Sequence, residues 1–386
     1  MNKTPHKLQY LEGVRGLAAL VVVIAHLKIL FAIDLETQSL AWLVNSTHSI
    51  FLGKLLNAFI DILFDGKFSV QVFWFLSGYV ISIKLFTGTG NEYLFNAVIK
   101  RYFRLAIPVL GAVLLGYGLL KAGFIYNHQL VEVMGPKYLS WTEFYNFQPN
   151  LVIALRSAVW DTFFNFNLKA SYNPVLWTMS PELYGSFFCF LLFAIFRKGR
   201  GRYFFYTGLA ILSVVFAYYW LTTFILGFFL CDIDHTENVF KKMISFLEEN
   251  ILSKWYYSIG ILLLLVLLNG FTQDFYSAYS KIFTSATGIF TIMHSKMLRD
   301  FFQQKLWVWL GKLSFGLYLV HMPIIFSLSL YLMVHLGFSH VVSATISALL
   351  SMIVILLVAV LFTRFVDRPA INISNRMAKF ILQFRS

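Results

Sequence analysis

The sequence has few charged residues and almost no cysteine. Only 13% of its 386 residues are Asp, Glu, Lys or Arg, while 59% are hydrophobic. A soluble globular domain carries about twice that charged fraction, so the soluble class is excluded. The two cysteines, Cys189 and Cys231, lie in apolar stretches and define neither a disulfide framework nor a metal site. The sequence also lacks a phosphate-binding glycine loop, a dinucleotide-binding motif and any metal-ligand spacing.

Uncharged apolar runs long enough to cross a bilayer recur along the chain, the clearest from Val341 to Phe362. We therefore predict an all-α, polytopic integral membrane protein with about ten transmembrane helices and both termini in the cytoplasm. The expected spans are residues 14–33, 67–86, 104–124, 176–196, 203–219, 220–232, 255–270, 281–298, 310–335 and 341–363. We expect one membrane domain, residues 1–386, with no appended soluble domain.

The basic residues explain the orientation. The formal net charge is +13, but Lys and Arg cluster beside the apolar runs, which is typical of cytoplasmic loops of membrane proteins rather than of nucleic-acid binding. The stretch 151–168 is apolar but contains Arg156 and Asp161, so we interpret it as an interfacial or re-entrant helix on the outer side. Residues 236–250 are expected to form an amphipathic helix on the inner side.

Two ionisable side chains on the first apolar run form the strongest candidate site. Arg15 lies at the entrance of the run and His26 in its middle, where an ionisable group is costly to hold and is therefore a functional candidate. Eleven residues apart on a helix, the two leave it on nearly one face, about 16 Å apart along the axis. This spacing suits a long anionic molecule that Arg15 holds by one end while His26 acts on the other.

Arg101 and Arg104 lie at the start of the predicted third span. Because they are three residues apart on a helix, they share a face, which we place at the cytoplasmic surface. Two neighbouring guanidiniums suit phosphate groups, since each can donate two parallel hydrogen bonds. The alternative interpretation is an anchor to lipid phosphates.

Glu182 follows Ser180 and Pro181, a natural N-cap and a natural first helical residue. In the first turn of a helix the dipole favours its carboxylate, which is a purely structural role. The functional alternative is a carboxylate at the outer mouth of the bundle that orients an imidazolium or holds a sugar hydroxyl.

His321 lies two residues before Pro323, which is expected to kink the span and free backbone carbonyls. The imidazole either bonds such a carbonyl or takes part in chemistry. Ser77 and Gly78 are typical of close helix packing. No G-x-S-x-G motif surrounds Ser77, so we do not interpret it as a nucleophile.

Six short motifs occur in one characteristic order. They are Leu11-Glu12-Gly13-Val14-Arg15-Gly16-Leu17-Ala18-Ala19-Leu20 with His26, Phe73–Ile81, Arg101-Tyr102-Phe103-Arg104, Trp177 with Glu182, Ser314–His321, and Asp367-Arg368-Pro369. In these motifs the chain resembles the membrane-bound acyltransferase 3 family, whose members acylate sugars of bacterial surface polysaccharides and related acceptors.

The resemblance implies an O-acetyltransferase that takes an acyl group, most often acetyl, from cytosolic acyl-CoA. The acceptor is a hydroxyl outside the cytoplasm, on a surface polysaccharide such as O-antigen or on a lipid-linked sugar. The resemblance also implies catalytic roles for His26 and Glu182, and phosphate binding by Arg15, Arg101 and Arg104. Secondary candidates are His321, Tyr318, Trp177 and Ser77. Whether the acyl group passes directly or through an acyl-histidine is left open.

The expected partners are membrane lipids, acyl-CoA and a glycan acceptor, without nucleic acid or a metal, in a bacterial cytoplasmic (inner) membrane. The sequence assigns no oligomeric state. Two other functions compete with an acyltransferase. A secondary transporter or sugar exporter also buries His and Arg, although no two-half repeat is found. A non-catalytic membrane partner or sensor is the other.

Overall fold

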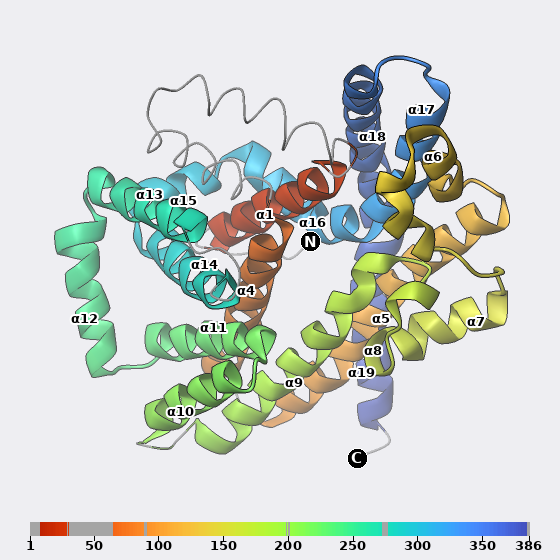
Figure 1. Cartoon of the computed structure of the whole chain (residues 1–386). Helices are drawn as coiled ribbons and strands as arrows, with labels where there is room; N and C mark the ends of the chain where they lie inside the picture. The colour runs from red at the N-terminus through yellow and green to blue at the C-terminus, as the bar shows by residue number, and fades with distance from the viewer. Residues whose placement is uncertain are drawn as a thin grey trace, which may run out of the picture. The chain divides into compact units, whose positions relative to one another are not determined.

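The structure, a computed structural model, describes residues 8–28, 30, 65–88, 91–197, 199, 201–271 and 277–383. Every regular element in these ranges is helical (Figure 1). In chain order the α-helices are α1 Gln9–Lys28, α4 Gly66–Thr87, α5 Asn91–Lys121, α6 Asn127–Met134, α7 Leu151–Arg156, α8 Thr162–Phe164, α9 Met179–Phe196, α10 Arg202–Val215, α11 Tyr219–His235, α12 Val239–Leu247, α13 Trp255–Phe271, α14 Ser277–His294, α15 Lys296–Phe302, α16 Lys305–Ile324, α17 Leu330–His335, α18 His340–Phe362 and α19 Arg368–Gln383.

Short turns of other pitch connect several of these helices. The tighter 3-10 turns are η4 Pro136–Glu143, η6 Leu168–Ala170 and η7 Pro174–Thr178. The wider π-helical turns are η5 Ser157–Asp161, η8 Glu248–Leu252, η10 Ile325–Ser329 and η11 Thr363–Asp367. One of them, η10, follows Pro323 in α16, where the sequence predicts a break.

Six helical stretches within the described ranges are long and apolar enough to cross a membrane: Gln9–Lys28, Gly66–Thr87, Leu94–Lys121, Pro174–Phe196, Lys305–His335 and His340–Gln383. A seventh arises if Val239–Leu252 and Trp255–Leu268, which meet at 100°, form one broken span. The prediction of an all-α membrane protein is thus confirmed in its coarse form. Ten spans and cytoplasmic termini stay predictions. Residues 29 and 31–33 of the first predicted span lie outside the described residues.

The stretch 151–168 does not form a span. Helix α7, turn η5 and helix α8 follow one another with 6, 5 and 3 residues and end at Phe164. Such a run is about 21 Å long, whereas a hydrocarbon core is about 30 Å thick. A non-spanning helix is therefore the right interpretation of this segment, and the side of the membrane on which it lies stays a prediction.

The chain divides into two compact units. Unit 1 comprises Met1–Val22, Leu43–Val98 and Tyr184–Ser314, and unit 2 comprises Val23–Trp42, Ile99–Leu183 and Phe315–Ser386. In unit 1, α4 and α11 pack so closely that their backbones touch. A Cβ added to Gly78 would lie 2.4 Å from the Phe224 carbonyl oxygen, and one added to Gly227 would lie 2.1 Å from the Phe75 carbonyl oxygen. The close approach expected from Ser77 and Gly78 is present.

A second backbone contact in unit 1 involves the start of α1. A Cβ added to Gly13 would lie 2.0 Å from the carbonyl oxygen of Phe302, at the end of α15. One added to Gly311 of α16 would lie 2.0 Å from the carbonyl oxygen of Glu12. Real Cβ atoms do not approach backbone this closely, so both positions require glycine. The glycines of the first motif are thus explained by helix packing.

Unit 2 is organised around the break in α16. The Phe326 carbonyl accepts a hydrogen bond from the Tyr126 backbone N–H at 3.1 Å. The Phe326 ring packs among those of Trp141, Phe144 and Tyr145, with centroids 5.1, 5.5 and 5.1 Å away. The aromatic segment after α5 therefore folds onto this break.

Candidate active site

Two histidines meet in the interior of unit 2. His26, near the end of α1, and His321, in α16, place their rings with centroids 5.0 Å apart and planes at 51°. His26 Nδ1 lies 3.3 Å from His321 Nε2. The His321 side chain is fully buried, with 0% exposure. Two residues 295 positions apart in the sequence therefore form one imidazole pair, in which His321 is buried and His26 is half-buried.

The direction of this hydrogen bond follows from the partner of the other His321 nitrogen. His321 Nδ1 lies 3.1 Å from the Leu317 carbonyl oxygen, which can only accept. Nδ1 must therefore carry a proton, so Nε2 of the neutral ring is an acceptor. His26 Nδ1 must then donate to it, and the neutral His26 ring carries its lone pair on Nε2. A lone pair on Nε2 is what a general base needs.

Turn η7 packs its polar groups against α16 beside this pair. The Tyr318 hydroxyl donates to the Val175 carbonyl at 2.9 Å and lies 2.8 Å from Thr178 Oγ1. All three residues are buried. The hydroxyl of Tyr318, a secondary candidate from the sequence, thus hydrogen-bonds to neighbouring residues of the same unit. Thr178 is a polar neighbour that sequence reasoning missed. Trp177 lies in the same turn, with its side chain 43% exposed.

Arg101 and Glu182 form an ion pair in unit 2, with side-chain exposures of 16% and 14%. The prediction that Arg101 lies at the inner surface and Glu182 at the outer mouth is wrong, because touching side chains cannot lie at opposite surfaces. The reason is the length of α5, which begins at Asn91. Arg101 therefore lies about 15 Å along the helix and not at its start.

Arg104 is paired as well. Its NH1 lies 2.6 Å from Asp367 Oδ1, and its guanidinium stacks over the Phe315 ring at 5.6 Å. Asp367 closes turn η11 and is mostly buried. The sequence singles out Asp367 only as part of the last motif. Its charge, opposite to that of Arg104, was the one sequence signal that could have suggested this pair. Arg101 and Arg104 thus each bind a carboxylate, while phosphate binding by either stays a prediction.

Arg15 and Ser77 belong to unit 1. Arg15 is half-buried on α1, and its Nε is enclosed with no hydrogen-bond partner among the described residues. Ser77 is 3% exposed within the α4 helix that packs on α11. Both residues belong to a different unit from the histidine pair, so the roles predicted for them stay predictions.

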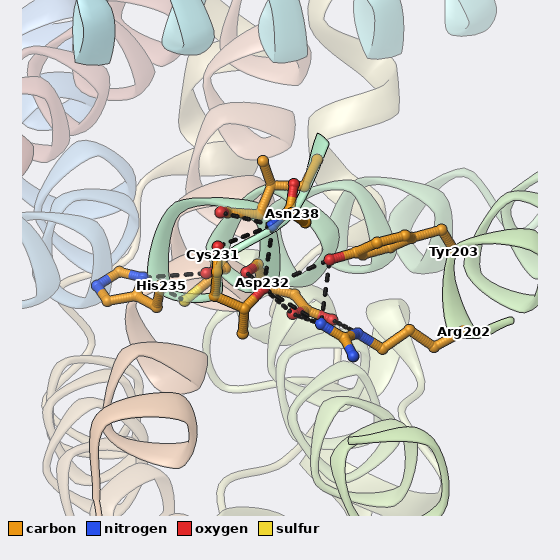
Figure 2. A network of polar contacts seen from close by, with 8 residues as sticks. Arg202, Tyr203, Cys231, Asp232, His235 and Asn238 are labelled. Carbon is orange, nitrogen blue, oxygen red and sulfur yellow. Dashed lines mark hydrogen bonds and ion pairs between the residues drawn. The ribbon is translucent and has the colours of Figure 1, made fainter. Parts of the chain in front are cut away.

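Unit 1 contains a polar network of its own (Figure 2). Arg202 binds Asp232 with two hydrogen bonds, Nε to Oδ2 at 2.7 Å and NH2 to Oδ1 at 3.0 Å. Asp232 is fully buried and also accepts from Thr236 Oγ1 at 3.0 Å. Asn238 caps α12 by accepting from the Lys241 N–H at 2.8 Å and donates to Thr236. The network fixes the ends of α10, α11 and α12.

A third histidine lies near this network and has acidic neighbours. His294 Nδ1 lies 2.8 Å from Glu248 Oε1, and His294 Nε2 lies 3.9 Å from Asp234 Oδ1. Asp234 also accepts a hydrogen bond from the Tyr79 hydroxyl at 2.8 Å. Burial raises the pKa of Asp234 above its ordinary value. In the part of the chain described, no group of three His, Cys, Asp or Glu side chains could hold a metal ion.

Long apolar helices define a membrane protein, and imidazoles within its helices are groups that membrane enzymes and transporters both use. A family model described as an acyltransferase domain, that of the acyltransferase 3 family, matches residues 8–364. The chain therefore belongs to the acyltransferase 3 family and is a membrane acyltransferase. Comparison with curated proteins and with solved structures gives no match.

Proposed function

We propose that this protein transfers an acyl group, acetyl in the first instance, from acyl-CoA to a hydroxyl of an acceptor outside the cytoplasm. The acceptor class is a surface polysaccharide or a lipid-linked sugar, and the membrane is the bacterial cytoplasmic membrane. Family membership supports the reaction class. The donor, the acceptor and the acetyl group come from the resemblance in the motifs.

One observation carries the assignment of the base: His26 Nδ1 lies 3.3 Å from His321 Nε2, and His321 Nδ1 is bound to a carbonyl. This arrangement gives the neutral His26 ring a defined tautomer with its lone pair on Nε2. An imidazole is suited to proton transfer near neutral pH. A second imidazole as the partner also stabilises the proton that His26 Nδ1 keeps when Nε2 gains another.

The proposed reaction is balanced within these groups. His26 Nε2 removes the proton of the acceptor hydroxyl as its oxygen attacks the thioester carbonyl carbon. The C–S bond then breaks, and the CoA sulfur leaves with the proton from His26. In the alternative route His26 Nε2 itself attacks the thioester carbonyl carbon, the C–S bond breaks, and CoA leaves as the thiolate. The acceptor hydroxyl then attacks the acyl-imidazole, the bond from the acyl carbon to Nε2 breaks, and the hydroxyl proton is taken up by the CoA thiolate. Both routes return His26 to its starting tautomer.

Glu182 and the arginines take supporting roles in this proposal. Glu182 is held by Arg101, so its carboxylate is fixed in direction and suits a hydrogen bond to an acceptor hydroxyl. Phosphate binding by Arg101 and Arg104 stays part of the proposal, since a guanidinium carries five N–H donors. Arg15 remains the predicted contact to the phosphates of the donor, because it lies eleven residues before His26 on α1.

The test uses membranes that contain the protein and acetyl-CoA labelled in its acetyl group. We expect label on a glycan with the wild type, and a loss of at least ~100-fold with His26→Ala at equal amounts of inserted protein. Label trapped on the wild-type protein at His26 identifies the acyl-histidine route. Transfer that survives in His26→Ala removes this residue from the mechanism. Movement of a sugar across the membrane without label transfer would establish the transporter alternative.

A further inference from the structure

The Leu319 carbonyl, at the break in α16, has an unusual hydrogen-bond donor. In a regular helix the Leu319 carbonyl accepts from the backbone N–H four residues later. That residue is Pro323, which has no N–H. The Leu319 carbonyl instead accepts a hydrogen bond from the side-chain amide of Asn173, Nδ2 to O at 2.7 Å. Pro323 is expected to free backbone carbonyls that the His321 ring can bind, but His321 Nδ1 contacts the Leu317 carbonyl.

Asn173 is held in place from three sides. Pro174 follows it, and the residue before a proline is restricted to extended backbone, which Asn173 adopts with φ −156° and ψ 107°. Ser171 Oγ accepts from the Asn173 N–H at 3.1 Å and donates to its carbonyl at 2.8 Å. The preceding Tyr172 is fully buried, and its carbonyl lies against Gly116 of α5, where a Cβ would come within 2.0 Å.

The orientation of the Asn173 amide is also informative. The side chain is fully buried, and Oδ1 has no hydrogen-bond partner among the described residues. A buried acceptor without a partner costs about 1–3 kcal/mol. The amide therefore has the orientation that its Nδ2 bond to Leu319 requires, at the expense of its oxygen. Because Nδ2 is bonded and Oδ1 is not, the role of the Asn173 side chain is that of a hydrogen-bond donor.

The carbonyl that Asn173 binds is close in sequence to the catalytic pair. His321 lies between Leu319 and Pro323, in the one turn of α16 whose backbone hydrogen bond is replaced by a side chain. The bond between His321 and His26 is 3.3 Å long, at the upper end of the usual range. A displacement of this turn by a few tenths of an ångström would break it. The turn therefore needs a fixed support, and Asn173 lies in a buried segment of unit 2 that is held by Ser171 and packed on Gly116.

We propose that Asn173 is a positioning residue for the His26–His321 pair: its side-chain amide supplies the donor that Pro323 removes, and so sets the position of His321. The inference rests on the proposed function, because it is the proposed base that is positioned. It adds a residue that none of the six sequence motifs contains.

The test is a double-mutant cycle between Asn173 and Pro323 in the full-length protein in membranes. Asn173→Leu removes the donor at similar size, and we expect kcat to fall roughly 10- to 100-fold with KM for acetyl-CoA nearly unchanged. Asn173→Asp, which also lacks the amide N–H₂, should be equally impaired. Pro323→Ala restores a backbone N–H for Leu319. In that background Asn173→Leu should cost less than about threefold.

Pro108→Ala is the matched control. Pro108 also lies inside a helix of unit 2, but Asn173 does not bind the carbonyl that it frees. The full loss from Asn173→Leu should therefore persist in the Pro108→Ala background. The same cycle measured as thermal unfolding should show coupling between Asn173 and Pro323 and none with Pro108.

Two results overturn the inference, and they are distinguishable. If Asn173→Leu costs the same with and without Pro323, or raises KM instead of lowering kcat, Asn173 does not position the pair, and the proposed function stands. If His26→Ala retains transfer, the proposed function fails and the inference fails with it. The thermal cycle still reports the Asn173–Leu319 contact in that case.

Discussion

The two units each contain a buried histidine at a helix contact, and the partners of the two rings differ. In unit 2, His321 meets a backbone carbonyl and the imidazole of His26. In unit 1, His294 meets the carboxylates of Glu248 and Asp234. The two carboxylates give His294 polar contacts that join helices of unit 1. A carbonyl and a second imidazole, as around His321, suit a ring that takes part in proton transfer. We therefore expect chemistry in unit 2 and a structural role for His294 in unit 1.

The same substitution in the two units gives the sharpest test of this comparison. His321→Leu should lower acyl transfer about 100-fold, because His26 Nδ1 loses its acceptor. His294→Leu should leave transfer per folded molecule within about threefold and lower thermal stability instead. Labelled-acetyl transfer and unfolding in detergent measure the two effects. His321→Gln sharpens the result, since its side-chain carbonyl can accept from His26 and should restore part of the activity. Equal losses at both histidines would end the comparison.

Breaking the Arg202–Asp232 pair tests the structural role of unit 1. Asp232→Asn removes the charge that a mostly buried guanidinium faces, and we expect a stability loss of about 3–5 kcal/mol. The transfer rate of the protein that remains folded should not change. Chemical unfolding followed by tryptophan fluorescence, with transfer measured on the folded fraction, checks both statements. A specific loss of transfer without a loss of stability would place this network in the catalytic machinery.

The Arg101–Glu182 pair allows a test within unit 2. Arg101→Gln or Glu182→Gln alone should each cost about 3 kcal/mol, since the partner charge remains buried with side-chain exposures of only 16% and 14%. The double variant should lose less than the sum, because no unpaired charge remains. Transfer kinetics then separate two functions of Arg101. A rise in the KM for acetyl-CoA alone, with stability intact, would favour phosphate binding over the ion pair.

The smallest effect is expected at the surface of unit 1. A hydrogen bond from Lys241 lowers the pKa of the Glu237 carboxyl. A lowered carboxyl pKa gives stability that is present above the ordinary pKa of about 4.3 and is lost as the pH falls. Because Glu237 is 88% exposed, solvent screens the pair. Glu237→Gln should therefore leave the unfolding temperature unchanged at pH 7 and at pH 4. A clear difference at pH 7 that vanishes at pH 4 would show that this pair matters.

The sequence predicts the helical class, the membrane location and the close helix contact at Ser77 and Gly78, because periodicity, apolar length and small residues are local properties. It also identifies His26 and His321 as separate candidates. It could not pair them, since their contact depends on how distant helices pack. The assignment of Arg101 and Glu182 to opposite sides was wrong for the same reason: a charge pattern along one helix does not show that a carboxylate elsewhere lies opposite Arg101. Pro323 predicted freed carbonyls in its span, but nothing in the sequence marked Asn173 as the donor to one of them.

The backbone contact between α1 and its neighbours in unit 1 has a consequence for variation. Most helix interfaces absorb a substitution by changing the rotamers of the residues across from it. At Gly13 and Gly311 the opposing surface is peptide backbone, at 2.0 Å from any added Cβ, so no rotamer change can make room. A library that randomises these positions should recover glycine almost alone, even when selection acts on expression and not on activity. Glycine that recurs at these two positions would then reflect the backbone contact between the helices, and it should not be taken as a sign of chemistry there.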